Sequence, residues 1–459
     1  MKTGNGSFWL DSTRGLAKQR PRLEGDLHCD IAVVGAGYTG LWTAYWLTQM
    51  DPSLRVAVLE QEYVGFGASG RNGGWISGKT VGVRRNLLSS SVDHGDLLAM
   101  ERECHRAVGE IVDLMAAEGK EIDAHRGGWM QVARSESERE RLRRHVEADR
   151  EWGLTPDEVV LLGAEEAAER FRSPGVTGAM FSPFAASCNP AKLVYALAEL
   201  CEDAGVEILE NTRVESIRDG DCRTSRGHVH ARNVVVAVEG YTPALPGLKR
   251  SILPMISSMV VTQPLTPAQW EEIGWNGYEC VSGAQHVYFY SQRTSDGRIA
   301  LGGRGRPYFW NSRTDDNGEL DSATAEQLMQ TLRGLFPSVP MAFEHAWRGV
   351  LGVPRDWSPF IDVDHNRRTV RAGGYAGQGV TAAFVAGRAT AGLLAGGPAE
   401  QPNPAWIRKA PRNWEPEPLR WIGTRAVQTL YSLADDAERR RGGPATSLFG
   451  AVADKVAGR

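Results

Sequence analysis

The sequence lacks any uninterrupted run of about 18 apolar residues, the length that a membrane-spanning helix needs. Its first ten residues lack the basic region and apolar stretch of a secretory signal. Its six cysteines are scattered, without a C-x-x-C pair or a histidine at metal-ligand spacing. We therefore expect a cytoplasmic protein with buried free thiols, no membrane partner and no metal site.

An excess of one charge sign is also missing. The chain has 52 basic and 56 acidic side chains, a net charge of −4, whereas a nucleic-acid-binding protein needs a strongly basic face. Hydrophobic residues make up 42% and charged residues 24%, which is typical of globular proteins. A chain of 459 residues is long enough for two domains. These features predict an ordinary globular enzyme with no nucleic-acid partner.

A nucleotide-binding pattern lies near the start of the chain. A short apolar strand at 30–34 runs directly into Gly35-Ala36-Gly37-Tyr38-Thr39-Gly40, and a helical pattern follows without a breaker. In this G-x-G-x-x-G arrangement, Gly35 permits a tight turn, Gly37 lets the backbone approach a pyrophosphate, and Gly40 lets helix and strand pack closely. The helix that begins at Tyr38 and Thr39 offers free N–H groups and a dipole to the diphosphate.

A second apolar strand, at 55–59, ends on Glu60, twenty residues beyond Gly40. A carboxylate at this position can accept hydrogen bonds from both ribose hydroxyls and would repel a 2′-phosphate. The pattern therefore favours FAD or NAD over NADP.

A long glycine-rich loop follows almost at once and favours a flavin. A flavin domain needs backbone that passes close to a flat ring and its ribityl chain, and glycine permits that approach. A nicotinamide dehydrogenase that uses only the first motif, or a flexible surface loop, remains an alternative. The predicted cofactor-binding residues in this loop are Gly67, Ala68, Ser69, Arg71, Asn72, Gly73 and Gly74, with Trp75 directly after them as a substrate-site candidate.

A second glycine cluster lies near the other end of the chain, at 373–379, before a helical stretch at 380–394 that is crowded with alanine and glycine. Such a helix would pack closely on a neighbour, and its N-terminus could stabilise negative charge on a flavin ring. Tight helix packing alone is the alternative. The candidates here are Gly374, Gly377, Gln378, Gly379 and Val380 for the cofactor and Tyr375 for the substrate.

These motifs, in this order, resemble the D-amino acid oxidase superfamily of flavoenzymes, which includes glycine oxidase and sarcosine oxidase. The segment Gly67 to Gly74 and the unit Trp347-Arg348-Gly349 look most similar to the gamma-glutamylputrescine oxidase branch. The helix start at 38–44 and the segment 413–418 resemble aminophosphonate oxidoreductases. The resemblance covers roughly residues 26 to 400.

The resemblance implies an FAD-dependent flavoprotein. No cysteine follows Cys280, and Arg71 rather than a histidine stands in the early loop, so we expect a non-covalent flavin at the family's usual linking positions. In this family a neutral amine gives a hydride to the flavin, the resulting imine is hydrolysed to an aldehyde or keto product, and the electrons pass to O₂ or another acceptor. No acid–base side chain is obligatory, so we name none. An FAD amine dehydrogenase and a non-catalytic flavin-binding subunit remain alternatives, and a homodimer is left open.

The resemblance also implies an α/β plus α+β fold, in which a discontinuous Rossmann-like FAD-binding domain is interleaved with an antiparallel-sheet substrate domain. The position that matches Val214 meets the adenine through its backbone in the family. The expected segments are a lead-in at 1–25, FAD-binding parts at 26–90, 158–248 and 345–400, substrate-domain parts at 91–157 and 249–344, and a tail at 401–459.

An alternating pattern at 285–290, followed by a turn at 295–298 and a returning strand at 299–303, predicts a hairpin. One face of its first strand carries His286, Tyr288 and Tyr290. Because the family places its sheet over the flavin, these side chains and Trp347 are candidates for the substrate pocket. A plain cross-strand aromatic stack is the alternative.

Three positions differ from the family pattern. Leu351 stands where glycine oxidase has a carboxylate-binding arginine, and Thr381 stands where sarcosine oxidase has a lysine. A buried carboxylate without a cation is costly, so simple alpha-amino acids are disfavoured as substrates. An amine whose charged group lies further away, such as a gamma-glutamylated polyamine, fits better. Ala300 replaces the oxygen-activating lysine, which leaves oxidase and dehydrogenase both open.

The tail is rich in proline and tryptophan at its start, and Trp406, Trp414 and Trp421 are expected to pin it to the body. An amphipathic helix is expected from Leu419. Packing is favoured over a role in closing the active site or in dimer contact.

Overall fold

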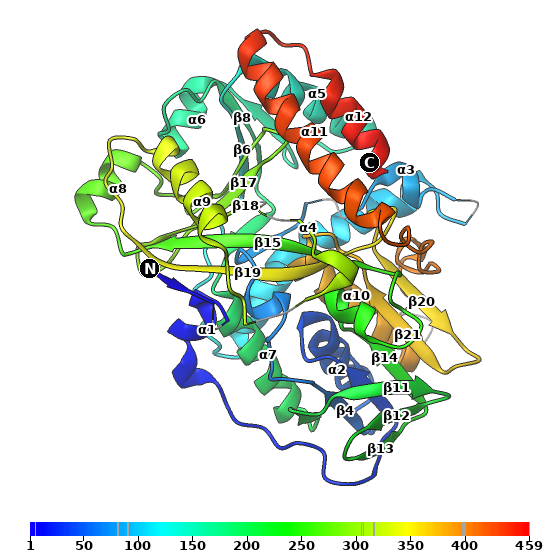
Figure 1. Cartoon of the computed structure of the whole chain (residues 1–459). Coiled ribbons are helices and arrows are strands. Elements are labelled where there is room, and N and C mark those ends of the chain that lie inside the picture. The colour runs from blue at the N-terminus through cyan, green and yellow to red at the C-terminus, as the bar shows by residue number, and fades with distance from the viewer. Residues whose placement is uncertain are drawn as a thin grey trace.

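The computed structural model describes residues 1–4, 6–79, 82–89, 91–303, 305, 307–314, 317–396 and 401–458. Two large sheets organise the fold, one in the lower half of Figure 1 and one in the upper half, with helices packed around both. The fold class expected from the sequence is therefore confirmed: a Rossmann-like α/β unit is combined with a second, largely antiparallel sheet.

The lower sheet has six strands, and all neighbours run parallel except the edge strand at 360–364, which is antiparallel to its neighbour. Its strands are short, and those at 31–34 and 56–59 are wholly apolar, as expected of a sheet that is covered on both faces. In spatial order they are β10 (Glu207–Leu209), β4 (Val56–Leu59), β3 (Ile31–Val34), β14 (Asn233–Val236), β21 (Thr369–Gly373) and β20 (Phe360–Asp364).

Three helices contact this sheet, namely α2 (Tyr38–Met50), α7 (Pro190–Asp203) and α10 (Gly379–Ala395), and α4 (His94–Ala117) packs on α10. The predicted helix at 380–394 is α10, and it packs directly on α2. A Cβ on Gly387 would lie 2.7 Å from Cβ of Trp42, so only glycine permits this crossing. The crossing brings the two glycine-rich motifs of the sequence to the same edge of the sheet.

The upper sheet has nine strands, which pair antiparallel except at the β1–β19 and β16–β6 contacts. In spatial order they are β1 (Lys2–Thr3), β19 (Phe343–Val353), β15 (Leu253–Thr262), β18 (Ile299–Gly303), β17 (Phe289–Arg293), β16 (Cys280–Gly283), β6 (Trp129–Ala133), β8 (Gly178–Ser182) and β7 (Val160–Leu162). The predicted return hairpin is β17–β18, but its first strand begins at Phe289 rather than at 285.

The sheets divide the chain differently from the expected segments. β7 and β8 belong to the upper sheet, although 158–248 was expected to lie with the FAD-binding unit. β19 also extends to Val353, past the expected boundary at 345. The lead-in is not a simple extension, because β1 forms an edge strand and the helix α1 (Phe8–Ser12) buries Phe8 and Trp9. The pairing of β1 with the distant strand β19 cannot be predicted from the sequence of the polar N-terminal segment.

Two smaller sheets complete the fold. A four-stranded sheet contains β11 (Val214–Arg218), β12 (Asp221–Thr224), β13 (Gly227–His230) and β2 (Leu27–His28). A two-stranded sheet joins β5 (Trp75–Ser77) to β9 (Ala185–Ser187). The remaining helices are α3 (Arg84–Leu87), α5 (Glu136–Trp152), α6 (Ala164–Arg170), α8 (Pro267–Ile273), α9 (Ser322–Leu335), α11 (Leu419–Arg441) and α12 (Leu448–Ala457).

The tail packs against the body as expected. Trp406 and Trp414 are buried, and the indole N–H of Trp414 donates to the carbonyl oxygen of Val353 at 2.8 Å. The predicted amphipathic helix is α11, which pairs with α12 along the top of Figure 1. All six cysteines are free and buried, as predicted. Among the described residues, no helix has the length and apolar character required to cross a membrane.

Candidate active site

A cavity of about 710 Å³ lies where the two large sheets meet. Its walls include Gly35 and Gly377 together, so the two glycine-rich motifs, more than 300 residues apart in the chain, face one space. The predicted residues that line it are Gly35, Gly37, Tyr38, Thr39, Glu60, Gly67, Ala68, Ser69, Arg71, Asn72, Gly73, Trp75, Val214, Tyr288, Tyr290, Tyr375, Gly377, Gln378, Gly379 and Val380.

The first glycine turn has the close packing that the sequence predicts. Gly35 has a φ of +106°, a conformation that favours glycine, and its N–H donates to the carbonyl oxygen of Leu59 at 2.8 Å. A Cβ on Gly40 would come within 1.9 Å of the carbonyl oxygen of Gly35. Helix α2 begins after Gly37 without a side-chain cap. The turn therefore leaves a cradle with backbone donors, which fits a diphosphate.

Glu60 lies at the carboxyl end of β4, on the wall of the cavity. Its carboxylate accepts hydrogen bonds from the N–H of Ala36 at 2.8 Å and of Glu62 at 2.9 Å. Burial is the largest influence and raises the pKa of this carboxyl to about 7. Val214 lines the same end of the cavity. This end could hold the adenosine part of a dinucleotide.

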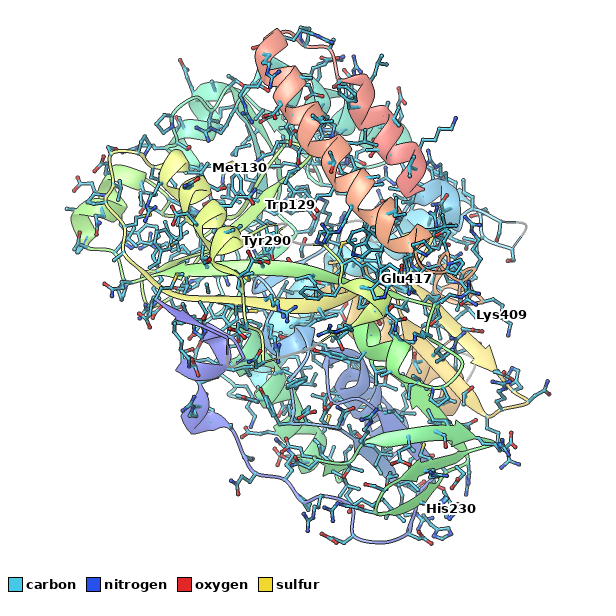
Figure 2. The ribbon with its side chains drawn as sticks, in the orientation of Figure 1. Trp129, Met130, His230, Tyr290, Lys409 and Glu417 are labelled. Atoms are coloured by element: carbon cyan, nitrogen blue, oxygen red, sulfur yellow. The ribbon has the colours of Figure 1, made fainter. Side chains whose placement is uncertain are left out.

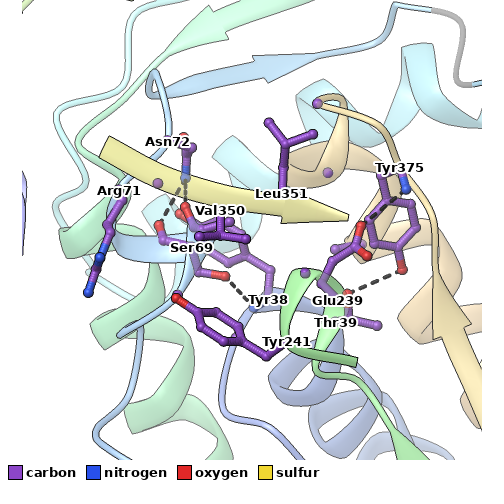
Figure 3. Close-up of a pocket in the computed structure, with 18 of the residues that line it drawn as sticks. Tyr38, Thr39, Ser69, Arg71, Asn72, Glu239, Tyr241, Val350, Leu351 and Tyr375 are labelled. Carbon is purple, nitrogen blue, oxygen red and sulfur yellow. Dashed lines mark hydrogen bonds between the residues drawn. The ribbon is translucent and has the colours of Figure 1, made fainter. Parts of the chain in front are cut away.

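The glycine-rich loop after Glu60 is fixed by internal hydrogen bonds (Figure 3). The side-chain amide of Asn72 donates to the carbonyl oxygens of Ala68 at 3.1 Å and Ser69 at 2.9 Å, and its oxygen accepts from the N–H of Gly74 at 2.8 Å. The hydroxyl of Ser69 accepts from the N–H of Tyr38 at 2.9 Å, which ties the loop to α2. A flexible surface loop, the alternative left open by the sequence, does not describe this segment.

Three donors from distant segments also hold the carbonyl groups of this loop. The Ser7 hydroxyl donates to Gly70 O at 2.6 Å, and the Trp9 indole N–H donates to Asn72 O at 2.9 Å. Between them, the Trp347 indole N–H donates to Arg71 O at 2.9 Å. Trp347 is therefore behind the loop rather than in the pocket, contrary to its predicted place at the substrate. Its side chain is fully buried.

Replacing Trp347 by phenylalanine is expected to lower the free energy of unfolding by about 1–3 kcal/mol, because a buried carbonyl loses its donor. The loop next to the cavity should loosen with it, so the affinity for FAD should fall as well. Thermal unfolding and FAD titration of the apoprotein measure both effects. Trp310→Phe is the matched control, since that side chain is 50% exposed. Equal behaviour of the two variants would contradict this role.

The late glycine cluster is joined directly to the first motif. The hydroxyl of Thr39, at the start of α2, donates to the phenol oxygen of Tyr375 at 3.2 Å (Figure 3). Gly377 has a φ of +102° and open space where a Cβ would point. Gln378 caps α10 without a side-chain hydrogen bond. Backbone donors at the start of α10 could therefore face a ring bound in the cavity.

Glu239 is a site residue that the sequence reasoning missed. It follows the buried strand β14 and accepts hydrogen bonds from the N–H of Gly374 at 3.3 Å and of Tyr375 at 3.1 Å. Burial raises the pKa of its carboxyl to about 7. Its position after the carboxyl end of a parallel strand is where ligands bind in open α/β sheets, and that rule could have identified it. Gly374 itself does not line the cavity.

Aromatic side chains close the cavity on the side of the upper sheet. The phenol of Tyr290 is 2.7 Å from the hydroxyl of Ser257, and its ring packs where a Cβ on Gly302 or Gly73 would lie. Trp75 meets this ring edge-on, with centroids 6.3 Å apart. Burial raises the pKa of Tyr290 to about 12, so the phenol stays neutral. Tyr290 can therefore donate a hydrogen bond and exclude water but does not act as a base.

His286 is not brought to the cavity, so its predicted substrate contact is corrected. Because β17 begins only at Phe289, His286 does not share a strand face with Tyr290. Its ring instead contacts the C-terminal layer, where Nε2 is 2.9 Å from both Glu438 Oε1 and Arg141 Nη2. Asp435 accepts from the N–H of His286 at 2.8 Å. This cluster attaches α11 to the upper sheet.

The remaining predicted residues outside the cavity are structural. Gly40 supports the helix–strand contact, and Gly74 has a φ of +69° with Cys188 O only 2.4 Å from where a Cβ would lie. Of the three positions that differ from the family pattern, Leu351 and Thr381 line the cavity. Ala300 is fully buried in the core that contains Trp347.

Comparison with known proteins agrees with this geometry. The model of the FAD dependent oxidoreductase family (DAO) matches residues 30–393. The gamma-glutamylputrescine oxidoreductase of Escherichia coli is 27% identical over 392 residues, which cover 82% of this chain and 85% of that protein. The glycine oxidase of Bacillus licheniformis is 25% identical, over 80% of this chain and 94% of that protein.

A solved structure shows the same fold. The crystal structure of glycine oxidase from Geobacillus kaustophilus superposes with a TM-score of 0.66 at 21% identity, over 80% of this chain and 95% of that one. The family match covers most of the chain, and the residues present form a cradle that fits a dinucleotide. The chain therefore belongs to the DAO family and is an FAD-dependent oxidoreductase.

Proposed function

We propose that this enzyme oxidises the C–N bond of an amine whose anionic group lies several bonds from the reacting carbon. The amine carbon loses two electrons and a proton, and the nitrogen loses a second proton, which leaves an imine. Water then converts the imine into an aldehyde or keto product with release of ammonia or an amine. A gamma-glutamylated polyamine is the leading substrate, because a relative that is 27% identical carries gamma-glutamylputrescine in its name.

The observation that carries this proposal is the lining of the cavity next to the flavin loop. Leu351 and Thr381 supply no cation there, and Tyr290 and Trp75 make the surroundings aromatic. An amino acid carboxylate held against Leu351 and Thr381 would be buried without a partner, which is costly. An aromatic pocket accepts a neutral amine and the methylene groups beside it without this cost.

We further propose which part of FAD each group of lining residues binds. The first glycine turn and the start of α2 bind the diphosphate, Glu60 binds the ribose hydroxyls, and Val214 meets the adenine. The loop at 67–74 and the start of α10 enclose the flavin ring, which carries the redox chemistry when bound. The side chains themselves orient the amine and exclude water. No cysteine lines the cavity among the described residues, so we propose that the flavin is held without a covalent bond.

Glycine, sarcosine and D-alanine are therefore expected to be poor substrates. The test is an anaerobic screen of the holoenzyme, in which bleaching of the flavin reports electron transfer from each amine. The panel contains these three amino acids, gamma-glutamylputrescine, putrescine and 2-aminoethylphosphonate, with dithionite as the control for a reducible flavin. Rapid bleaching by glycine, sarcosine or D-alanine would contradict the proposal that the pocket at Leu351 and Thr381 does not accept the carboxylate of a simple amino acid.

Readmitting air to the bleached enzyme separates oxidase from dehydrogenase. With Ala300 in the core, the lysine that activates oxygen in sarcosine oxidase has no counterpart at the predicted position. The rate of recolouring therefore measures whether O₂ or another acceptor takes the electrons.

A further inference from the structure

The last two helices of the chain expose a large share of its apolar side chains. Among the described residues, 14 large hydrophobic side chains are exposed, and half of them lie on α11 and α12, which have 23 and 10 residues. Figure 1 shows these helices side by side on the outside of the upper sheet, and they pack on each other. Their exposed apolar residues, here called the C-terminal surface, range from 44% to 82% exposed and are Leu419, Ile422, Leu433, Leu448, Phe449, Val452 and Val456. The family match ends at residue 393 and does not account for this layer.

The outer side of α11 carries a heptad spacing. Intervals of three and four residues alternate between the exposed residues Leu419, Ile422, Ala426, Thr429 and Leu433. Such a spacing places side chains on one narrow stripe, the pattern of a helix that packs along another helix. The middle of the stripe holds the small Ala426 and the polar Thr429, which suit close helix packing better than insertion into lipid. The stripe therefore fits a helical partner.

The inner sides of both helices fix this layer to the body. Glu417, labelled near the lower end of α11 in Figure 2, accepts a hydrogen bond from the phenol of Tyr308 at 2.6 Å. The cluster around His286 holds the other end of α11. The buried hydroxyl of Tyr431 donates to Asp454 at 2.6 Å, which joins α11 to α12. Because the layer is already ordered, a partner can bind it without the cost of ordering a segment.

The area of the C-terminal surface suits a stable interface. Seven large side chains that are about half exposed offer roughly 600 Å² of apolar area. The largest apolar patch on a monomer is usually about 300–600 Å², whereas each partner of a standard interface contributes about 800 Å². The surface therefore lies at the upper limit for a monomer and supplies most of one side of such an interface.

We propose that the C-terminal surface binds a second copy of this chain, in a two-fold symmetric dimer whose α11 helices pack antiparallel about Ala426. The stripe is self-complementary, because Leu419 and Leu433 each lie seven residues from Ala426. An antiparallel partner places Leu433 of the partner subunit opposite Leu419, and the two Ala426 side chains meet at the axis, where their small size permits close approach. The exposed stripe of α12 widens the contact into a four-helix arrangement. This dimer does not depend on which amine is oxidised.

Sedimentation equilibrium of the holoenzyme tests both the dimer and its register. The double variant Leu419→Arg/Leu433→Arg brings like charges together across the axis and is expected to raise the dimer dissociation constant by about 100-fold or more. Leu419→Glu/Leu433→Arg places opposite charges at the same contacts and should bind at least about tenfold tighter than the double-arginine variant. Leu16→Arg is the matched control, because Leu16 is 53% exposed outside this surface. FAD content and thermal unfolding confirm that each variant is folded.

Cross-linking provides a second measurement that leaves the charges of the leucine contacts unchanged. All six native cysteines are buried, so Ala426→Cys supplies an exposed thiol at the axis, and a short bis-maleimide should join the two chains. Arg440→Cys is the matched control on the same side of α11, 14 residues beyond Ala426. At about 1.5 Å per residue, the two control thiols of the antiparallel dimer would be roughly 40 Å apart, beyond the reach of this reagent.

Four results would overturn the proposal. An interface of this size binds with micromolar or tighter affinity, so a holoenzyme that remains a monomer at about 100 µM does not form it. A dimer that the double-arginine variant leaves intact uses another face. The same yield of cross-linked dimer from Ala426→Cys and Arg440→Cys rejects the antiparallel register. A monomer that sediments with phosphatidylglycerol vesicles, and loses this binding in the variants of Leu419 and Leu433, would make a lipid surface the partner instead.

Discussion

Replacing Gly40 by alanine is expected to remove FAD from the protein. The added Cβ would lie 1.9 Å from the carbonyl oxygen of Gly35 and 3.1 Å from Cγ1 of Val33, and neither the turn nor the buried strand can yield. Helix α2 must then move away from β3, at a cost of about 1–3 kcal/mol for an overpacked contact. The same movement displaces the backbone donors from the diphosphate, and losing about 3 kcal/mol there weakens FAD binding by more than 100-fold.

The control for this variant is Gly334→Ala. Gly334 also lies in a helix, α9, but nothing lies within 4 Å of where its Cβ would be. Alanine at such a position is expected to stabilise the protein by about 0.4–1 kcal/mol. FAD content of the purified proteins and fluorescence titration of the apoproteins compare the two. Normal FAD content in Gly40→Ala would show that the first turn does not bind the cofactor.

The affinity for FAD is expected to depend on pH through Glu60. Hydroxyl donors from a ribose stabilise the ionised carboxylate, but burial raises the pKa of this group to about 7. Below that pH, binding must expel a proton. As the pH falls from 7 to 5, the dissociation constant of FAD should therefore rise about tenfold for each pH unit.

Glu60→Gln is expected to flatten this dependence, since its amide has no proton to lose. Glu60→Ala should weaken FAD binding by about 100-fold at pH 8, because hydrogen bonds to a charged group contribute about 1.5–3 kcal/mol each. Fluorescence titration from pH 5 to 8 measures both variants. A Glu60→Gln protein with the same slope as the unaltered one would assign the proton to another group, such as Glu239.

The same group has the opposite effect on the stability of the apoprotein. Its pKa in the folded chain, about 7, lies above the ordinary value for glutamate, so the folded state holds the proton more tightly than the unfolded state. The stabilising contribution is present below the ordinary pKa and is lost as the pH rises to about 7. Bound FAD should reduce this loss, because it offers donors to the ionised carboxylate.

The sequence predicts those parts of the site whose residues are neighbours in the chain. The first turn, Glu60 and the loop at 67–74 each carry a local pattern with a physical reason, and all three reach the cavity. The close packing of the late helix could also be predicted, because a helix with so many alanine and glycine residues can approach a neighbouring helix closely.

The rest depends on contacts between distant segments, which one sequence does not reveal. Trp347 and Trp9 act on the flavin loop through hydrogen bonds to its carbonyl groups, and nothing near either residue in the chain indicates this. Alternation, together with the family's placement of its sheet over the flavin, predicts His286 in the pocket, but its ring instead meets Glu438 of the tail helix.

The crystal structure of the FAD-bound enzyme would test the account most directly. We expect one FAD per chain, with its diphosphate against the backbone at Gly35 and Gly37 and its ring between Gly73 and Gly377, beneath Tyr290. An FAD that touches only one of the two glycine clusters, or that lies elsewhere on the molecule, would contradict the assignment of the cavity and every role derived from it.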